Sequence, residues 1–165
     1  MSQHPLSVWH AMHGSSDSWM KTLFCATGAM RSWVSENRTD VPLKPYATDP
    51  DLKDSWINWA STEGLTSAGC WYRAMAENIQ QGTEKKKILE TNGGKVETPY
   101  LFIGADGDAV CRTEAIEGVK QAGLVKQEDL EVVELHSGHW VPFEKPKEVG
   151  EAVLGWLRKQ GFAGQ

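Results

Sequence analysis

The sequence predicts an α/β protein in which a helical region is followed by a strand, helix, strand, helix unit. Apolar residues of the first part, residues 1–92, recur mostly at helical spacing. Residues 93–165 instead contain short apolar runs, Tyr100 to Ile103 and Leu130 to Leu135, and the first of these is typical of a strand covered on both faces. A helix is expected after each run. We therefore expect two regions, a helical one and one built on a parallel strand pair.

Three helices are predicted in residues 1–92. The first runs from Asp17 to about Glu36, because apolar side chains there recur near the spacing of one helical face. The second opens at Pro50, which is preorganised for a first helical position and follows Asp49, a suitable cap. It ends at Gly64. Its buried stripe is expected to contain Leu52, Trp56 and Trp59 or Ala60.

The third helix is expected to start at a cap supplied by Thr66 or Ser67. Residues four apart share one of its faces: Trp71, Met75 and Ile79. Tyr72 points about 100° away from that face in a regular helix, so it is free to look elsewhere than the local core. The polar, charged segment 81–94 ends in two glycines and is the best candidate for a junction between the two regions.

The second region is predicted to be a βαβα unit. A helix over residues 113–122, with Ala115, Ile116 and Val119 inward, separates the two strands, and this order implies a right-handed parallel crossover. Pro146 opens the last helix. Its core-facing stripe follows the i, i+3, i+4, i+7, i+8 pattern: Val149, Ala152, Val153, Trp156 and Leu157.

Charge and composition exclude several classes of protein. The net charge of −5 gives no basic face, which disfavours nucleic-acid binding. Three dispersed cysteines, Cys25, Cys70 and Cys111, fit reduced thiols in a cytoplasmic protein. The first twenty residues form neither a signal peptide nor a membrane span. The histidines among them are expected to be surface residues of a loose terminus: His4, His10 and His13.

The candidate chemistry follows the two strands. In parallel α/β sheets, reactive groups lie in loops past the carboxyl ends of strands. Asp108 follows the first strand and His139 follows the second, so we expect them within hydrogen-bonding reach of each other. A carboxylate in that position orients an imidazole, whose other nitrogen is then left to act as a base.

The order of these segments resembles the end of an α/β-hydrolase. Gly138-His139-Trp140, followed by Glu144-Lys145-Pro146 and an amphipathic helix, looks particularly like soluble epoxide hydrolases. The run Cys70-Trp71-Tyr72-Arg73-Ala74-Met75 is similar to a cap-domain helix of the same family. The resemblance covers the chain from about Asp17 onward and implies a partial α/β-hydrolase: a helical cap remnant, then the last two strands of the sheet.

The resemblance implies roles for five residues. Asp108 would be the acid, His139 the general base and Tyr72 a cap tyrosine that donates a hydrogen bond to the epoxide oxygen. Trp71 and Trp140 would line the substrate pocket. The implied reaction converts a small hydrophobic epoxide to a diol through an aspartate nucleophile and a histidine-activated water, without a cofactor or metal.

The resemblance leaves out the nucleophile. No elbow or oxyanion-hole loop precedes residue 66, and the second polarising tyrosine is unmatched, since Tyr46 lies in a proline-flanked loop. We therefore expect a truncated chain that is inactive alone. The strand pair would also have an unpaired sheet edge, so the chain is expected to be marginally stable or to associate with itself.

Other readings stay open. Asp106 is more readily a turn residue than a nucleophile, because family order places the nucleophile before the acid and the histidine. Asp108 could likewise be only a turn residue, and His139 only an exposed loop residue. The His136 and His139 spacing lacks a matching ligand cluster, which makes a metal site improbable. The chain could also be a non-catalytic binding or dimerisation module, or serve another α/β-hydrolase chemistry, such as ester or carbon–halogen hydrolysis.

Overall fold

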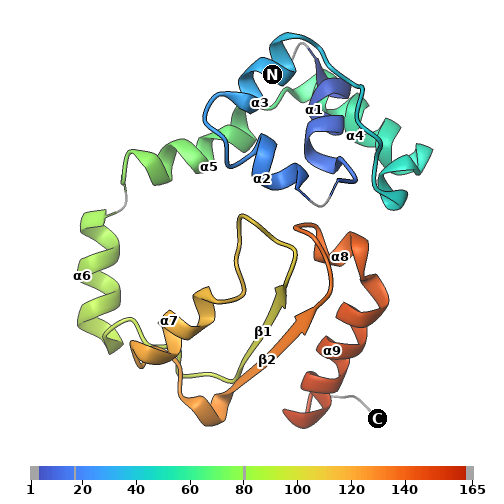
Figure 1. Cartoon of the computed structure of the whole chain (residues 1–165). Coiled ribbons are helices and arrows are strands. Elements are labelled where there is room, and N and C mark those ends of the chain that lie inside the picture. Colours follow the sequence, from blue (N-terminus) through green and yellow to red (C-terminus); the bar gives the residue numbers. More distant parts are fainter. Residues whose placement is uncertain (1–3, 17, 80, 163–165) are drawn as a thin grey trace. The chain divides into compact units, whose positions relative to one another are not determined.

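The computed structural model describes residues 4–16, 18–79 and 81–162 (Figure 1). The chain forms two compact units that divide between Thr83 and Glu84. The predicted division into a cap region, 1–92, and a core region, 93–165, stays a prediction. The segment proposed as a junction is itself largely helical, since α6 spans Gln81–Asn92. It ends where Gly93 takes a left-handed backbone conformation, with a φ of 70°.

The first unit is helical. Its elements up to α6 are α1 (Pro5–His13), α2 (Trp19–Leu23), α3 (Ala29–Ser35), η1 (Pro45–Thr48), α4 (Pro50–Glu63) and α5 (Thr66–Ala76). The core cluster comes from the first three helices: Val8, Ala11, Leu23, Trp33 and Val34. The expectation of a loose terminus is therefore wrong for the described residues. Helix α1, with Pro5 in its first turn, supplies core side chains, and His13 is buried.

Two buried tryptophans, Trp9 and Trp33, and the half-buried Trp19 hold this unit together. Trp9 is almost fully buried, and its indole N–H donates to the Ala47 carbonyl, 3.1 Å away. Trp19 donates to the Ala11 carbonyl at 2.8 Å, and Trp33 donates to the Ser7 carbonyl at 3.0 Å. A buried indole stabilises a fold through its apolar area only if its N–H finds an acceptor. Trp9 and Trp19, which the sequence pattern left unexplained, have this structural role.

The predicted helix from Asp17 to Glu36 is wrong in its continuity. Asp17 lies outside the described residues, and the rest forms two helices, α2 and α3. Gly28, directly before α3, has a φ of 82°, a left-handed conformation that glycine adopts at no steric cost. The apolar spacing is helical on both sides of this break, which is why periodicity alone did not reveal it.

The structure confirms the predicted start of helix α4 after Asp49 and its predicted end at Gly64. One carboxylate oxygen of Asp49 accepts hydrogen bonds from the backbone N–H groups of Asp51 and Leu52. Gly64 follows the last residue of the helix. Ala60 is fully buried and Trp56 is half-buried, whereas Trp59 is 43% exposed. Of the two alternatives for the stripe, Ala60 is therefore the buried one.

Helix α5 forms as predicted, but its cap and its apolar face differ from expectation. The cap position is Leu65, and neither Thr66 nor Ser67 caps the helix with its side chain. The residues expected to share a packed face are all exposed: Trp71, Met75 and Ile79. Ile79 lies beyond the helix, because the chain turns at Asn78, which has a φ of 53°.

The second unit contains the predicted βαβα order. After α6 come β1 (Tyr100–Ala105), α7 (Ala115–Gln121), η2 (Gln127–Asp129), β2 (Leu130–Leu135), α8 (Val141–Glu144) and α9 (Pro146–Lys159). The strands pair in parallel, with Tyr100 opposite Leu130 and Ala105 opposite Leu135. This confirms the parallel pair and makes the unit compatible with part of an α/β fold. The handedness of the crossover stays a prediction.

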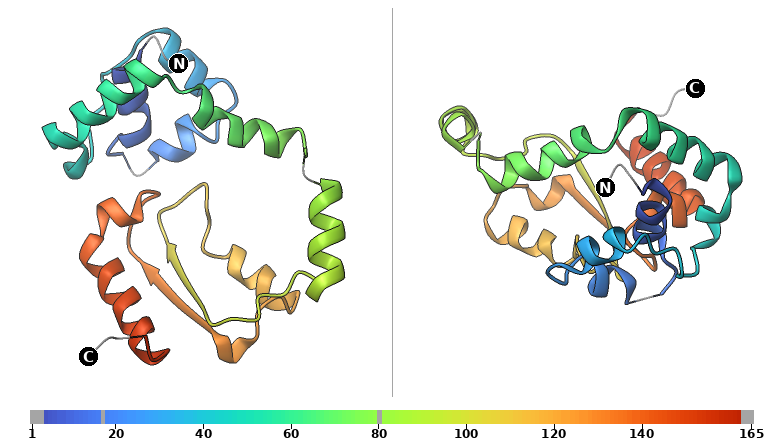
Figure 2. Two further views of the ribbon diagram at one scale, coloured as in Figure 1. Left: turned by 180° about the vertical axis from the view of Figure 1, so that it is seen from behind. Right: turned by 90° about the horizontal axis from the view of Figure 1, so that it is seen from above.

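Helices α7 and α9 lie on opposite sides of the strand pair (Figures 1 and 2). Helix α9 packs against both strands, and its predicted stripe is half-buried. Helix α7 is shorter than predicted. Ile116 is buried and Val119 half-buried, but Ala115 is exposed, which corrects its inward assignment.

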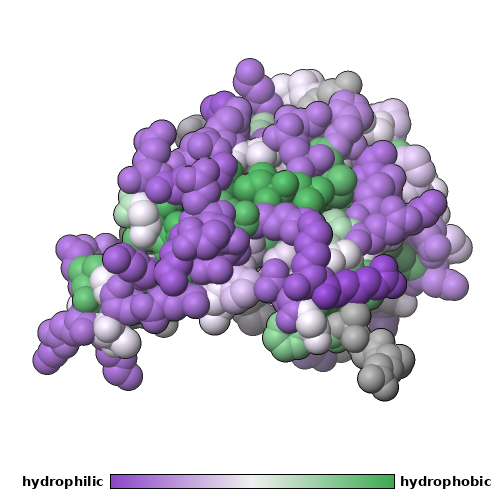
Figure 3. Space-filling view, turned by 90° about the horizontal axis from the view of Figure 1, so that it is seen from below, coloured by the Kyte–Doolittle hydropathy of each residue, from purple (hydrophilic) through white to green (hydrophobic). Residues whose placement is uncertain are grey.

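The strand pair is not covered on every side. Within the described residues the sheet has two strands, and the exposed residues Val132 and Glu134 alternate with half-buried ones along β2. The face of the molecule in Figure 3 carries a patch of hydrophobic residues surrounded by hydrophilic ones. In the part of the chain that the structure describes, no helix has the length and apolarity needed to cross a membrane.

Candidate functional site

The candidate site lies at the carboxyl ends of β1 and β2. These strands end opposite each other at Ala105 and Leu135, so the loops that follow leave the sheet at the same edge. The backbone links the two loops directly, because the Gly107 N–H donates to the Ser137 carbonyl at 3.0 Å. The topology therefore brings together two segments that lie about thirty residues apart in the sequence.

Asp108 and His139 form the expected hydrogen bond. Nδ1 of His139 lies 2.8 Å from Oδ2 of Asp108, whose other oxygen accepts from the N–H groups of Val110 and Cys111. Asp108 is 8% exposed, and the His139 side chain is mostly buried. An ionised carboxylate can only accept, so Nδ1 carries the proton and Nε2 is left with its lone pair. This arrangement orients a base.

The environment of Asp108 favours its charged form. Burial raises the pKa of the carboxyl, but the N–H groups of Cys111 and Val110, together with His139, outweigh it and hold the pKa below its ordinary value. Asp108 is therefore ionised at neutral pH. Its carboxylate is available both as an acceptor and as a countercharge when the imidazole becomes protonated.

This shift predicts how the second unit responds to acid. A lowered native pKa contributes stability that is fully present above the ordinary carboxyl pKa of about 3.9 and is lost as pH falls through the lowered native value. Amide hydrogen exchange of β1 and β2, measured at about pH 6 and about pH 3, should show a loss of protection that is smaller in Asp108→Asn. An equal loss in both proteins would contradict this prediction.

Glu144 holds the His139 loop through two hydrogen bonds to its backbone. One carboxylate oxygen of Glu144 accepts from the Gly138 N–H at 3.0 Å, and the other accepts from the Trp140 N–H at 3.2 Å. The two residues that flank His139 are thus bound to one side chain. The Trp140 ring contacts the His139 ring edge-on, with centroids 4.9 Å apart. Trp140 therefore lies beside the candidate base, and its role as a pocket residue stays a prediction.

Gly107 is required by the close approach of the two loops. A Cβ added there would lie 2.8 Å from the Ser137 carbonyl oxygen, which is backbone and cannot rotate away. We expect Gly107→Ala to separate the loops, to weaken the bond between Asp108 and His139, and to destabilise the second unit by about 1–3 kcal/mol. Chemical denaturation and the ring-nitrogen NMR signals of His139 measure both effects.

Gly118 provides the matched control for Gly107. It lies in α7, and a Cβ there would meet no atom within 4 Å. Gly118→Ala is therefore expected to stabilise the helix by about 0.5–1 kcal/mol and to leave the His139 signals unchanged. If the two variants behave alike, the close contact at Gly107 does not organise the site.

Asp106 and His136 form a second pair at the same sheet edge. Oδ2 of Asp106 lies 2.8 Å from Nδ1 of His136, and Oδ1 accepts from the Ser137 N–H. The hydrogen bond from His136, together with that from Ser137, holds the pKa of Asp106 below its ordinary value despite some desolvation. The His136 side chain is 95% exposed. Asp106 therefore binds across the two loops, which is more than the turn role expected of it.

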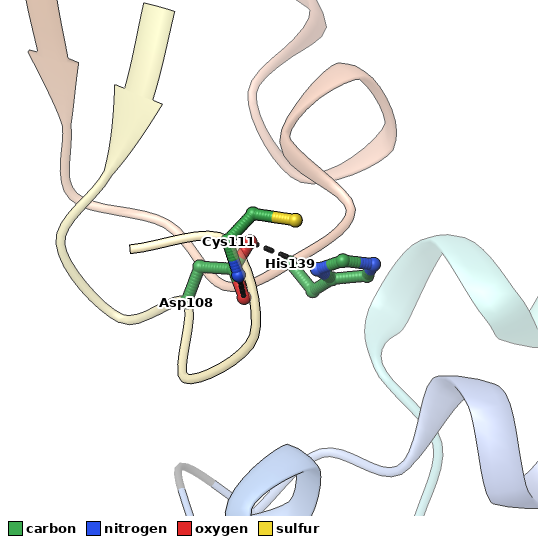
Figure 4. Close-up of side chains that lie close together, drawn as sticks. All are labelled: Asp108, Cys111 and His139. Atoms are coloured by element: carbon green, nitrogen blue, oxygen red, sulfur yellow. Dashed lines mark hydrogen bonds and ion pairs between the residues drawn. The ribbon is translucent and has the colours of Figure 1, made fainter. Parts of the chain in front are cut away.

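Cys111 is a site residue that the sequence reasoning missed. Its sulfur, a carboxylate oxygen of Asp108 and a ring nitrogen of His139 all lie within 4.8 Å of one another (Figure 4). The signal in the sequence was the Asp-x-x-Cys spacing, because an aspartate that accepts from the N–H three residues later turns the chain back on itself. The sequence had indicated no ligand cluster that matches the His136 and His139 spacing, whereas the structure adds Cys111 to the carboxylate expected beside His139.

The two residues that the resemblance assigns to a cap, Trp71 and Tyr72, lie in the first unit. Tyr72 and Trp71 belong to α5 and are 73% and 69% exposed. Trp71 therefore does not pack in a local core, and the exposure of Tyr72 agrees with its predicted direction away from one. Their roles beside an epoxide stay predictions.

Two curated proteins are similar to this chain. Bifunctional epoxide hydrolase 2 of Mus musculus is 26% identical over 122 residues, which is 73% of this chain, and bifunctional epoxide hydrolase 2 of Rattus norvegicus is 25% identical over 122 residues. The match covers 20% of each relative, so the chain spans about a fifth of their length. No family model matches the chain. No solved structure matches it. The similarity indicates a hydrolase-like origin related to epoxide hydrolases.

Proposed function

We propose that the chain provides the acid–base half of an epoxide hydrolase-like active site, with His139 as the general base and Asp108 as its orienting acid. The observation that carries the proposal is the 2.8 Å hydrogen bond between Nδ1 of His139 and Oδ2 of Asp108. It joins two loops that leave adjacent parallel strands at one edge. The distant similarity to two epoxide hydrolases supports the choice of reaction.

The proposed reaction has two steps. An aspartate nucleophile attacks an epoxide carbon, the C–O bond breaks, and Tyr72 donates a hydrogen bond to the oxygen that gains negative charge. Nε2 of His139 then takes a proton from water as its oxygen attacks the ester. The acyl C–O bond of the ester then breaks, and the departing alkoxide takes the proton held by the imidazolium. The oxygen freed by ring opening receives the proton that the carboxylic acid releases through solvent, so the diol leaves and the carboxylate nucleophile is regenerated. Asp108 stabilises the imidazolium formed in the second step, and Trp71 and Trp140 line the pocket for a small hydrophobic substrate.

No residue of this chain is matched to the nucleophile, so we propose that the 165-residue chain is inactive alone. A histidine and aspartate pair without the covalent step retains only general base catalysis, which contributes about 10²–10⁴-fold at best. Diol formation from an aryl-substituted epoxide should stay at background. Turnover that disappears in His139→Ala would contradict the proposed inactivity while supporting the base.

A chimera tests the base directly. The segment of the mouse relative that aligns with β1 through α9 is replaced by residues 99–162 of this chain. If that protein does not fold, only the two loops, residues 104–113 and 136–146, are grafted. The chimera is expected to convert epoxide to diol, and His139→Gln is expected to abolish the second step, so that the covalent ester accumulates and is detected by mass spectrometry.

The matched control is His136→Gln. His136 is also an imidazole paired with an aspartate at the same sheet edge, but it is almost fully exposed. Its replacement is expected to leave turnover unchanged. Equal losses in the two variants, or turnover without His139, would overturn the proposed role. Faster hydrolysis of an ester or a haloalkane would instead assign another α/β-hydrolase chemistry.

The open sheet favours a second candidate function, a non-catalytic module for binding or self-association. Among the described residues, β1 and β2 pair only with each other, and Tyr100 and Val132 are exposed apolar residues on them. Strand edges and apolar faces of this kind pair readily with another chain. Sedimentation over a range of concentrations should show dimers that persist in His139→Gln. A monomer with one cooperative thermal transition would exclude this candidate.

A further inference from the structure

We propose that Asp108, Cys111 and His139 bind a thiophilic divalent cation of the zinc class. The three side chains converge at the carboxyl edge of the sheet, where their oxygen, sulfur and nitrogen atoms lie within 4.8 Å of one another (Figure 4). They come from two loops that the parallel strands bring together. Nothing in the proposed hydrolase chemistry requires Cys111, so this site adds a function for it.

The donor set selects the cation. Zinc is bound in proteins by cysteine sulfur, histidine nitrogen and aspartate oxygen, which are the three atoms present here. Calcium and magnesium take oxygen ligands and gain little from a sulfur or an imidazole. Three protein ligands also leave a fourth tetrahedral position for water or an external ligand. The site therefore fits an open zinc site better than a closed structural one.

The distances are close to what a tetrahedral cation needs. Ligand atoms on one zinc ion lie about 3.3–3.6 Å apart, given zinc bonds of about 2.0–2.3 Å. Oδ2 of Asp108 and Nδ1 of His139 are 2.8 Å apart, and the Cys111 sulfur, a carboxylate oxygen of Asp108 and a ring nitrogen of His139 lie within 4.8 Å of one another. Shifts of about 1 Å in the ligand atoms are thus enough for all three to bind one cation. Cys111 is exposed, so its side chain can rotate without disturbing a packed core.

The backbone around these ligands is already held in place. Oδ1 of Asp108 accepts from the N–H of Cys111 and so fixes two ligands relative to each other, which leaves Oδ2 for the cation. Glu144 fixes the loop of His139 through the N–H groups on both sides of it. A site whose ligands are held before binding loses less conformational entropy when the cation arrives.

The cation would take the place of the proton between Nδ1 and Oδ2. That proton moves to Nε2, and the thiol of Cys111 loses its own proton to solvent as its sulfur becomes a thiolate ligand. One proton is released for each cation bound. Because Nε2 then carries a proton, His139 cannot accept one from water. Cation binding and the proposed base role therefore exclude each other, and the site would silence the dyad.

Cobalt serves as the spectroscopic probe for zinc. The reduced, chelator-treated 165-residue chain is titrated with Co²⁺, and a thiolate-to-cobalt charge-transfer band is expected to saturate at one equivalent and to disappear when Zn²⁺ is added. Cys111→Ser should abolish the band. His139→Gln and Asp108→Asn should each weaken Zn²⁺ binding at least about tenfold.

Two variants control for the ligand types. Cys70→Ser changes an exposed thiol that donates within α5 to the Thr66 carbonyl, and His136→Gln changes the exposed imidazole next to the site. Both should keep the band and the affinity. Cys111→Ser is decisive, because an exposed side chain can be replaced without unfolding, which circular dichroism verifies. A band that survives Cys111→Ser, or the absence of saturable binding, would overturn the site. Neither result bears on epoxide turnover.

Discussion

Replacing Asp108 with asparagine is expected to reverse the tautomer of the His139 ring. The amide has nearly the same shape, and its oxygen can still accept from the N–H groups of Val110 and Cys111. Its NH₂ group would then face Nδ1 of His139, which must accept, so the proton moves to Nε2. Nitrogen-15 NMR of the ring distinguishes the two tautomers. In the chimera, turnover should fall on the order of 10⁴-fold, as the same change does in a Ser-His-Asp triad.

Asp106→Asn is the control for this prediction. It makes the same chemical change at the same sheet edge, in a carboxylate that binds His136. We expect it to alter the His136 signals and to leave those of His139 unchanged. If His139 keeps its proton on Nδ1 in Asp108→Asn, the carboxylate does not set the tautomer, and the orienting role is wrong.

Trp33→Ala is expected to destabilise the first unit by about 3–5 kcal/mol. Trp33 is 4% exposed, it donates to the Ser7 carbonyl, and its ring packs edge-on against Trp19. The replacement leaves a cavity and removes the indole hydrogen bond to the Ser7 carbonyl. Urea denaturation followed by circular dichroism of the helical signal measures the loss.

Trp71→Ala is the matched control, because it removes the same side chain from a position that is 69% exposed. Its expected cost is within about 0.5 kcal/mol, as for most surface substitutions. A large cost at Trp71 would show that α5 packs against something in solution. A small cost at Trp33 would contradict the tryptophan-centred core.

The site was largely predictable because one topological rule determines it. Parallel strands place their carboxyl ends at one edge, so Asp108 and His139 had to approach each other once the apolar runs before them were recognised as strands. Cys111 and Glu144 were not predictable in the same way. Their contacts depend on how each loop turns, and short loops of polar residues carry no periodic signal from which a turn can be derived.

The helical unit shows where apolar spacing fails. Helix α4 was predictable, because Asp49 and Pro50 form a local start signal and Gly64 a local stop. Helix α1 was missed, although Pro5 and the pair Val8 and Trp9 were available, because three histidines made the segment look polar. The apolar face of α5 was expected to be packed, but spacing indicates only that residues share a face and not what covers it.

The hydrogen bonds of Glu144 bear on two properties of the site: the position of the His139 imidazole and the size of the side chain beside it. The two carboxylate oxygens of Glu144 accept from the main-chain N–H groups of Gly138 and Trp140, which a substitution of the Trp140 side chain leaves in place. If Trp140 lines the substrate pocket as proposed, a smaller or larger side chain there should change which substrates enter while these two hydrogen bonds keep the imidazole in place. Selectivity and proton transfer could then be altered one at a time, at positions adjacent in the chain.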